Sequence, residues 1–189
     1  MFRIIIWNDS NGSAWVFSHI GTGDLNTHEL EIEDCTVVYS RAHWHHWSGG
    51  SIFNMRGAGK GEGGFTITFR NIQVEDPRPT LQPFKILMQG RYMRKEKYFS
   101  KFIKHFCLGL EPYASENHRR GPGDLHGIVF ENITIAAPSV LNEPDILWGM
   151  SDGLIYDLTF RNVMIGDKKV TGVDHFMHNE YVFDKKPEK

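Results

Sequence analysis

The chain has 189 residues, a formal net charge of −2, and 40% hydrophobic and 23% charged residues. These values suit a single domain with a hydrophobic core. They disfavour disorder and a dedicated nucleic-acid-binding protein, which would carry an excess of basic charge. The longest apolar run, Ile4 to Trp7, is far shorter than the ~20 residues of a membrane-spanning helix, so we expect no membrane partner.

The N-terminal segment, residues 1–7, is apolar and predicts a buried strand. It lacks the basic start and the small-residue cleavage site of a signal peptide. A polar turn at residues 8–12 follows, between Trp7 and Trp15, and it places amides and a carboxylate beside aromatic faces. This combination suits contact with a sugar as well as a plain turn that ends at glycine. The polar side chains concerned are Asn8, Asp9 and Asn11.

A repeated pattern begins at residue 30. It has two apolar residues two apart, a charged residue, Asn or Asp, and two further apolar residues two apart. The four copies are 30–37, 67–74, 128–135 and 158–165. Because side chains alternate along a strand, the change of phase predicts a corner at Asn or Asp, which tolerate a left-handed backbone. The corner residues are Asp34, Asn71, Asn132 and Asn162.

Short strands that repeat with a fixed corner are typical of a parallel β-solenoid. We therefore predict an all-β solenoid in which the corner side chains hydrogen-bond from coil to coil. We also expect Asn132 to point inward, which argues against use of its Asn-Ile-Thr sequence as a glycosylation site. A β-sandwich is the alternative, but the two-residue hairpin signals of sandwiches are scarce in this sequence.

The segment 41–47, Arg-Ala-His-Trp-His-His-Trp, combines histidine and tryptophan. At most two of its three histidines share a strand face, and no nearby cysteine or carboxylate completes a ligand set, so we predict no metal. Its tryptophans could instead form a stacking platform for sugar rings, with arginine and histidine as hydrogen-bonding groups. Ordinary loop packing is the alternative. The side chains predicted to contact a ligand are Arg41, His43, Trp44 and Trp47.

The interval between the second and third corners contains a basic segment. Residues 91–105 carry six Lys or Arg and one acid. The spacing of Tyr98, Phe102 and Phe106 suits an amphipathic helix. We predict a helical or loop insertion near residues 91–110 on the surface of the solenoid. Binding to a membrane surface or an anionic ligand is the alternative.

Three features carry a resemblance to a known superfamily. They are W-N-D-x-N-G at 7–12, C-T-V-V-Y-S-R at 35–41, and the repeated Phe-Arg/Glu-Asn-Ile/Val corners. The chain resembles the pectinase-like right-handed parallel β-helix superfamily. Within it, the likeness is to glycoside hydrolase family 49, the dextranase and isopullulanase group, and to polygalacturonase-like proteins. The resemblance implies a right-handed parallel β-helix over residues 1–189, interrupted by the insertion at 91–110.

The resemblance also implies a function. It indicates a secreted or periplasmic carbohydrate-active protein that degrades a polysaccharide through carboxylate acid/base chemistry, without a cofactor. The catalytic aspartates of family 49 lie in coils before its Trp-x-Asn-Asp-like segment. We therefore expect this chain to hold C-terminal coils, with Asp9 the one candidate acid within it. It would supply part of the groove for a polysaccharide or oligosaccharide. The predicted substrate-binding residues are Asn8, Asp9, Asn11, Arg41, His43, Trp44, Trp47, Arg56 and Gln89.

Two other functions stay open. A non-catalytic β-helix could bind a glycan through its aromatic side chains, and a structural module could stack coils without any ligand. Convergence of two acids in one groove would favour hydrolysis over both.

Overall fold

The structure, a computed structural model, describes residues 4–8, 14–20, 28–40, 51–57, 65–77, 82–88, 124–137, 145–149 and 153–188. Among these residues the regular elements are β-strands and one short 3-10 helix, η2 (Val173–His175), so the predicted all-β class is confirmed for them. The strands are β1 (Ile4–Asn8), β2 (Trp15–Ile20), β3 (His28–Ser40), β4 (Ser51–Gly57), β5 (Phe65–Val74), β6 (Gln82–Met88), β7 (Leu125–Ile135), β8 (Ile146–Trp148), β9 (Ile155–Ile165), β10 (Lys168–Val170) and β11 (Met177–His178). The predicted insertion at 91–110 lies outside the described residues.

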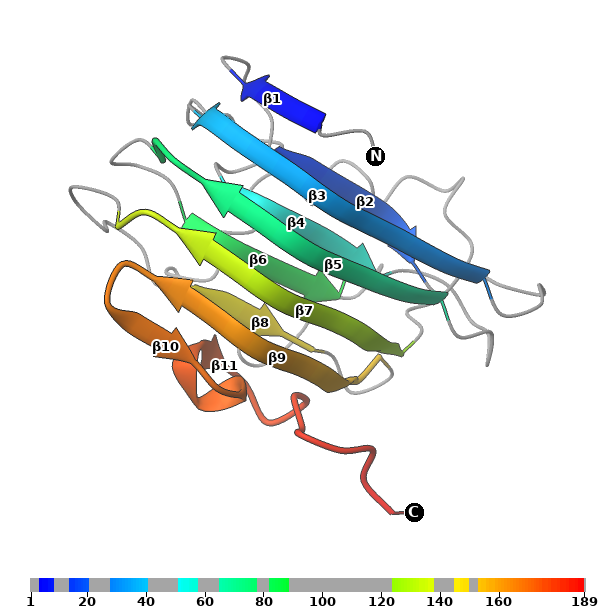
Figure 1. Cartoon of the computed structure of the whole chain (residues 1–189). Helices are drawn as coiled ribbons and strands as arrows, with labels where there is room; N and C mark the ends of the chain where they lie inside the picture. Colours follow the sequence, from blue (N-terminus) through cyan, green and yellow to red (C-terminus); the bar gives the residue numbers. More distant parts are fainter. Residues whose placement is uncertain are drawn as a thin grey trace.

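The strands form two sheets that lie one behind the other (Figure 1). Sheet A has the order β1-β3-β5-β7-β9-β10, and sheet B has the order β11-β8-β6-β4-β2. The chain therefore alternates between the sheets from β1 to β9, and each new strand pairs with the strand two positions earlier. These pairs are parallel, whereas β10 pairs with β9 in an antiparallel hairpin.

The four predicted corners are present in sheet A. The φ angles of Asp34, Asn71, Asn132 and Asn162 are 55°, 55°, 53° and 51°. Each asparagine donates from Nδ2 to the side-chain oxygen of the corner residue one strand earlier, at 3.0, 3.2 and 3.0 Å. The predicted amide ladder is thus confirmed. The expected inward direction of Asn132 is wrong, because its side chain is exposed and the ladder runs along the outside of the sheet.

The corners keep apolar side chains on the inner face along the whole strand. In β5, Ile67 and Phe69 are buried before the corner, and Ile72 and Val74 are buried after it. Strict alternation would turn the second pair toward solvent, but the left-handed residue restores the phase. A second row of left-handed residues, Gly127 and Asp157, lies nearer the start of β7 and β9 and was not predicted from the sequence.

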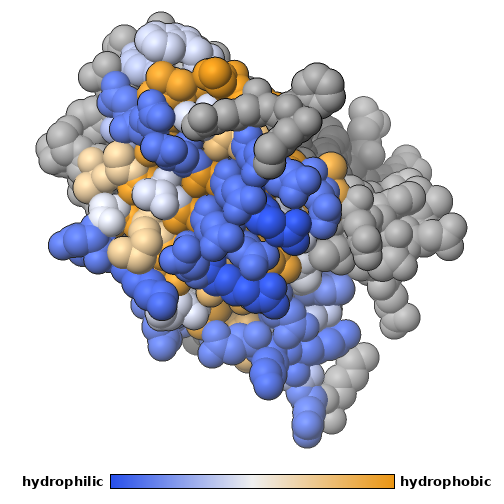
Figure 2. All heavy atoms as spheres, in the orientation of Figure 1, coloured by the Kyte–Doolittle hydropathy of each residue, from blue (hydrophilic) through white to orange (hydrophobic). Residues whose placement is uncertain are grey.

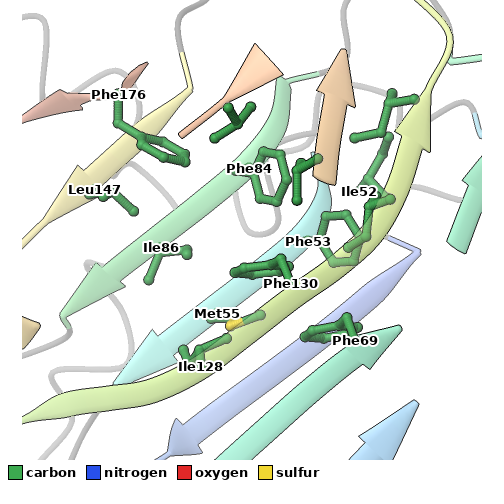
Figure 3. Close-up of a cluster of buried hydrophobic side chains, with 14 of the residues drawn as sticks. Ile52, Phe53, Met55, Phe69, Phe84, Ile86, Ile128, Phe130, Leu147 and Phe176 are labelled. Carbon is green, nitrogen blue, oxygen red and sulfur yellow. The ribbon is translucent and has the colours of Figure 1, made fainter. Parts of the chain in front are cut away.

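Stacked phenylalanines fill the space between the sheets (Figure 3). On sheet A, the ring of Phe130 lies between those of Phe69 and Phe160, at centroid distances of 5.3 and 5.2 Å and within 5° of parallel. On sheet B, Phe53 and Phe84 stack at 5.0 Å. The two stacks meet edge to face, an arrangement that aromatic quadrupoles favour. The core therefore fixes the register between strands far apart in the sequence.

Candidate functional site

Most of the predicted ligand-binding side chains lie outside the described residues. This applies to Asp9, Asn11, Arg41, His43, Trp44, Trp47 and Gln89. The backbones of Asn8 and Arg56 are described, in β1 and β4, but their side chains are not. The strand register still shows where these parts of the chain leave the sheets.

The register of β1 with β3 brings the starting points of two predicted ligand-binding segments together, at the carboxyl ends of these strands in sheet A. Asn8, the last residue of β1, is the partner of Ser40, the last residue of β3. Asp9 and Arg41 therefore continue from neighbouring strand ends. The next strand adds Asp76, whose carbonyl oxygen accepts a hydrogen bond of 3.1 Å from the Ser40 amide. We call this place, with Trp7, Asn8, Tyr39, Ser40 and Asp76, the β1–β3 edge.

Arg56 and Gln89 belong to a different place. Arg56 precedes the last residue of β4, and Gln89 directly follows β6, which pairs with β4. The strands of sheet B point in the opposite sense to those of sheet A (Figure 1). At about 3.3 Å per residue, the ends of β4 and β6 lie on the order of 20 Å from the β1–β3 edge. The described backbone thus does not bring these two positions to the other predicted residues.

An exposed aromatic pair occupies the β1–β3 edge. The rings of Trp7 and Tyr39 stack with centroids 4.6 Å apart and an interplanar angle of 13°. Trp7 is 68% exposed, whereas the other described aromatic stacks pack in or against the core. Sequence reasoning assigned Trp7 to a buried strand and so missed this pair. The sequence motif did place Trp7 next to the polar turn, but nothing in it showed that Trp7 packs on Tyr39.

A row of alternating charges crosses the outer face of sheet A. Glu33, Arg70, Glu131 and Arg161 are register partners on four consecutive strands. Arg70 Nε donates to Glu131 Oε2 at 3.2 Å, and Arg70 Nη1 lies 3.5 Å from Glu33 Oε2. The bond to Glu131 and the nearby carboxylate charges raise the pKa of Arg70 above its ordinary value. Hydrophilic side chains accordingly cover the middle of this face (Figure 2).

The charged row does not form a catalytic acid pair. Glu33 and Glu131 lie two strands apart, so their backbones are separated by roughly 9.5 Å. The guanidinium of Arg70, however, lies between them and contacts both carboxylates. It occupies the space that a water molecule or a sugar would need. The row therefore aligns the strands rather than acting on a substrate.

Asp124 and Asp145 are also engaged in hydrogen bonds within the fold. Asp145 Oδ1 accepts from the Phe84 amide at 2.7 Å, and its Oδ2 lies 2.9 Å from His175 Nε2. Asp124 Oδ1 accepts from the Leu154 amide at 3.0 Å. Asp145 is buried, and its two oxygens are engaged by the backbone of β6 and by His175 of η2.

Cys35 is a buried free cysteine in β3. Burial, with a further contribution from the Asp34 charge, raises the pKa of the Cys35 thiol, which disfavours the reactive thiolate. Among the residues that the structure describes, no three His, Cys, Asp or Glu side chains cluster closely enough to hold a metal ion. In the same part of the chain, no helix has the length and apolar character needed to cross a bilayer.

Comparison with known proteins leaves the family of the chain open. No protein-family model, no curated protein and no solved structure matches it.

Proposed function

We propose that the two sheets are successive coils of a right-handed parallel β-helix. The support is the regular alternation of the chain between the sheets, with parallel pairing at each return. The corner ladder, repeated on four strands, adds to it. Right-handedness follows the general rule for crossover connections between parallel strands.

We further propose that this β-helix binds a polysaccharide at the β1–β3 edge, as part of a substrate groove. The observation that carries the proposal is the exposed Trp7–Tyr39 stack, which presents a flat aromatic face beside polar strand ends. Such a face suits the apolar side of a sugar ring, while amides and carboxylates pair with its hydroxyl groups. Asn8 and Ser40, the last residues of β1 and β3, pair at this edge and supply polar groups next to the aromatic stack.

Hydrolysis of the polysaccharide is a second candidate function, and the resemblance to glycoside hydrolases favours it. The carboxylates of Glu33, Glu131 and Asp145 are held by basic partners, and Asp124 accepts a backbone hydrogen bond. A catalytic pair would therefore use other acids, of which Asp9 is the candidate from the sequence. The chain itself is proposed to bind glycan, in a secreted or periplasmic protein.

Affinity electrophoresis on dextran, pullulan and polygalacturonate gels tests the binding proposal. We expect retardation on at least one polymer, loss of retardation for Trp7→Ala, and partial retention for Trp7→Phe, which keeps a flat ring. Thr134→Ala, an exposed change on the outer face of β7, is the control and should behave like the parent chain. If the parent chain migrated on all three polymer gels as it does on a gel without polysaccharide, the binding proposal would be wrong. Release of reducing ends in a parallel assay would establish hydrolysis and place the acids within the chain.

A further inference from the structure

Of the four corners of sheet A, Asn132 alone begins an Asn-x-Ser/Thr sequence. Thr134 follows it by two residues, whereas Gln73 and Met164 follow the other two corner asparagines at this spacing. The side chains of Asn132 and Thr134 are both exposed. They lie on β7, an interior strand between β5 and β9, on the face that hydrophilic side chains cover (Figure 2). The acceptor sequence for N-linked glycans therefore faces solvent, because the corner side chain points outward.

The corner ladder uses only one of the two hydrogens on Asn132 Nδ2. This nitrogen donates to Asn71 Oδ1 on β5 at 3.2 Å, and Asn132 Oδ1 accepts from Asn162 Nδ2 on β9 at 3.0 Å. Since β5 and β9 lie on opposite sides of β7, the donated hydrogen is the one trans to Oδ1. The second hydrogen of a primary amide is cis to the oxygen and, in a planar amide, points away from Cβ. It takes no part in the ladder.

An N-glycosyl linkage replaces this second hydrogen. In a trans secondary amide, the substituent on nitrogen lies cis to the oxygen, and the remaining hydrogen lies trans to it. A sugar on Asn132 Nδ2 would therefore project away from the backbone, while the trans hydrogen still donates to Asn71. Asn132 Oδ1 would be unchanged and would still accept from Asn162. The ladder and a glycan are thus compatible at the same side chain.

We propose that Asn132 is an N-glycosylation site whose side chain keeps both ladder hydrogen bonds after modification. The inference rests on the proposed secreted location, because its donor is an oligosaccharide linked through pyrophosphate to a polyisoprenoid lipid. In the transfer, Nδ2 forms a bond to the anomeric carbon of the donor and loses one proton. The bond from that carbon to the pyrophosphate oxygen breaks, and the lipid pyrophosphate leaves with the electron pair. Transfer precedes strand pairing, while Nδ2 is still accessible.

A glycan at Asn132 leaves the proposed polysaccharide-binding site accessible. Tyr39 of the β1–β3 edge lies five residues beyond Asp34, which is the corner of β3 in the ladder with Asn71 and Asn132. Tyr39 is therefore displaced from Asn132 by roughly 16 Å along the strands and roughly 9.5 Å across two strand spacings. The glycan would instead cover the outer face of sheet A and keep other domains from packing there.

Site mapping of the 189-residue chain, secreted from a eukaryotic host behind a cleavable leader, tests the modification. An amidase that releases N-glycans converts each modified Asn to Asp, and tandem mass spectrometry locates the conversion. We expect it at Asn132, on a peptide distinct from the second acceptor sequence at 11–13. Thr134→Ala removes the acceptor sequence but leaves the ladder intact, so conversion at Asn132 should fall to background. Thr134→Ser keeps the acceptor sequence and should stay modified.

An unmodified Asn132 in the secreted parent chain would overturn the proposal, and so would modification that persists in Thr134→Ala. Because the host supplies the secretory location, either result would leave the proposed location and the proposed glycan binding untouched.

Urea unfolding tests whether the modified side chain keeps its ladder bonds. The glycosylated chain is compared with the same chain made without glycosylation in a bacterial cytoplasm. We expect the glycosylated chain to have an equal or higher urea midpoint, because both hydrogen bonds are kept. Asn132→Gly, which removes both bonds, should have a lower midpoint than either form. A glycosylated chain with a lower midpoint than the unmodified chain would show that the ladder is broken and would overturn this part of the proposal.

Discussion

The corner ladder allows a prediction that reverses the usual order of two substitutions. Asn132 has a φ of 53°, donates to Asn71 Oδ1 at 3.2 Å, and accepts from Asn162 Nδ2 at 3.0 Å. Replacement by either alanine or glycine removes both hydrogen bonds. Only alanine also forces a Cβ into the left-handed region, which glycine enters freely. We therefore expect Asn132→Gly to be less destabilising than Asn132→Ala.

The magnitude follows from adding these contributions. Two exposed hydrogen bonds at the low end of their range contribute about 1 kcal/mol together. The left-handed backbone adds about 1 to 2 kcal/mol for alanine, partly offset because asparagine itself is only tolerant of that region. Glycine avoids the strain but costs about 0.5 to 1 kcal/mol in chain entropy. We expect losses of roughly 2 kcal/mol for Asn132→Ala and roughly 1 kcal/mol for Asn132→Gly.

Urea unfolding followed by circular dichroism measures both losses. The matched control is Thr134, an exposed residue two positions further along β7 without a positive φ. In regular strand backbone glycine is the worse choice, so Thr134→Gly should be less stable than Thr134→Ala by about 0.5 to 1 kcal/mol. If Asn132→Ala proved as stable as Asn132→Gly, the assignment of strain and tolerance at the corner would be refuted.

Two further substitutions test the core and a buried phenol. Phe130→Ala removes a fully buried ring that contacts four other phenylalanines and should cost about 3 to 5 kcal/mol in urea unfolding, whereas a loss below about 1 kcal/mol would contradict a close-packed stack. Burial, chiefly, raises the pKa of Tyr156 above its ordinary value of 10.0, so the folded chain keeps the phenolic proton more tightly than the unfolded chain. The resulting stability is fully present below the unfolded-state pKa and is lost as pH rises through the higher folded-state pKa, so Tyr156→Phe should flatten the alkaline fall in urea midpoint. Identical pH profiles for parent and variant would contradict the assignment.

The sequence predicted the positions of the corners correctly but not the direction in which the Asn132 side chain points. The corners at Asp34, Asn71, Asn132 and Asn162 were found because alternation and left-handed tolerance depend on neighbouring residues alone. The same pattern could not tell that Asn132 faces solvent. A phase shift fixes which flanking residues turn inward, whereas the direction of the corner side chain depends on the partner one strand away.

The candidate site shows the same division. The motif at 7–12 and the segment after Tyr39 were recognised as polar and aromatic, and the register of β1 with β3 then placed their starting points together. No spacing in the sequence could show that Trp7 stacks on Tyr39. Nor could it show that Arg56, near the end of β4, lies far from the ends of β1 and β3, because the strands of sheet B run in the opposite sense. Both outcomes depend on which strands become neighbours.

What the sequence determined by itself is the repeating unit: alternating apolar residues, an Asn or Asp corner, and a return to the same inner face. These features follow from backbone sterics and side-chain alternation within a few residues. Tertiary structure alone decided which carboxylates are taken up by structural partners, as in the contact of Arg70 with Glu131, 61 residues away. It alone also decided that Asn132 and Thr134 lie exposed on the outer face of β7. The physical reason is that pairing, burial and charge neutralisation are set by the register between distant strands, and that register exists only once the sheets have formed.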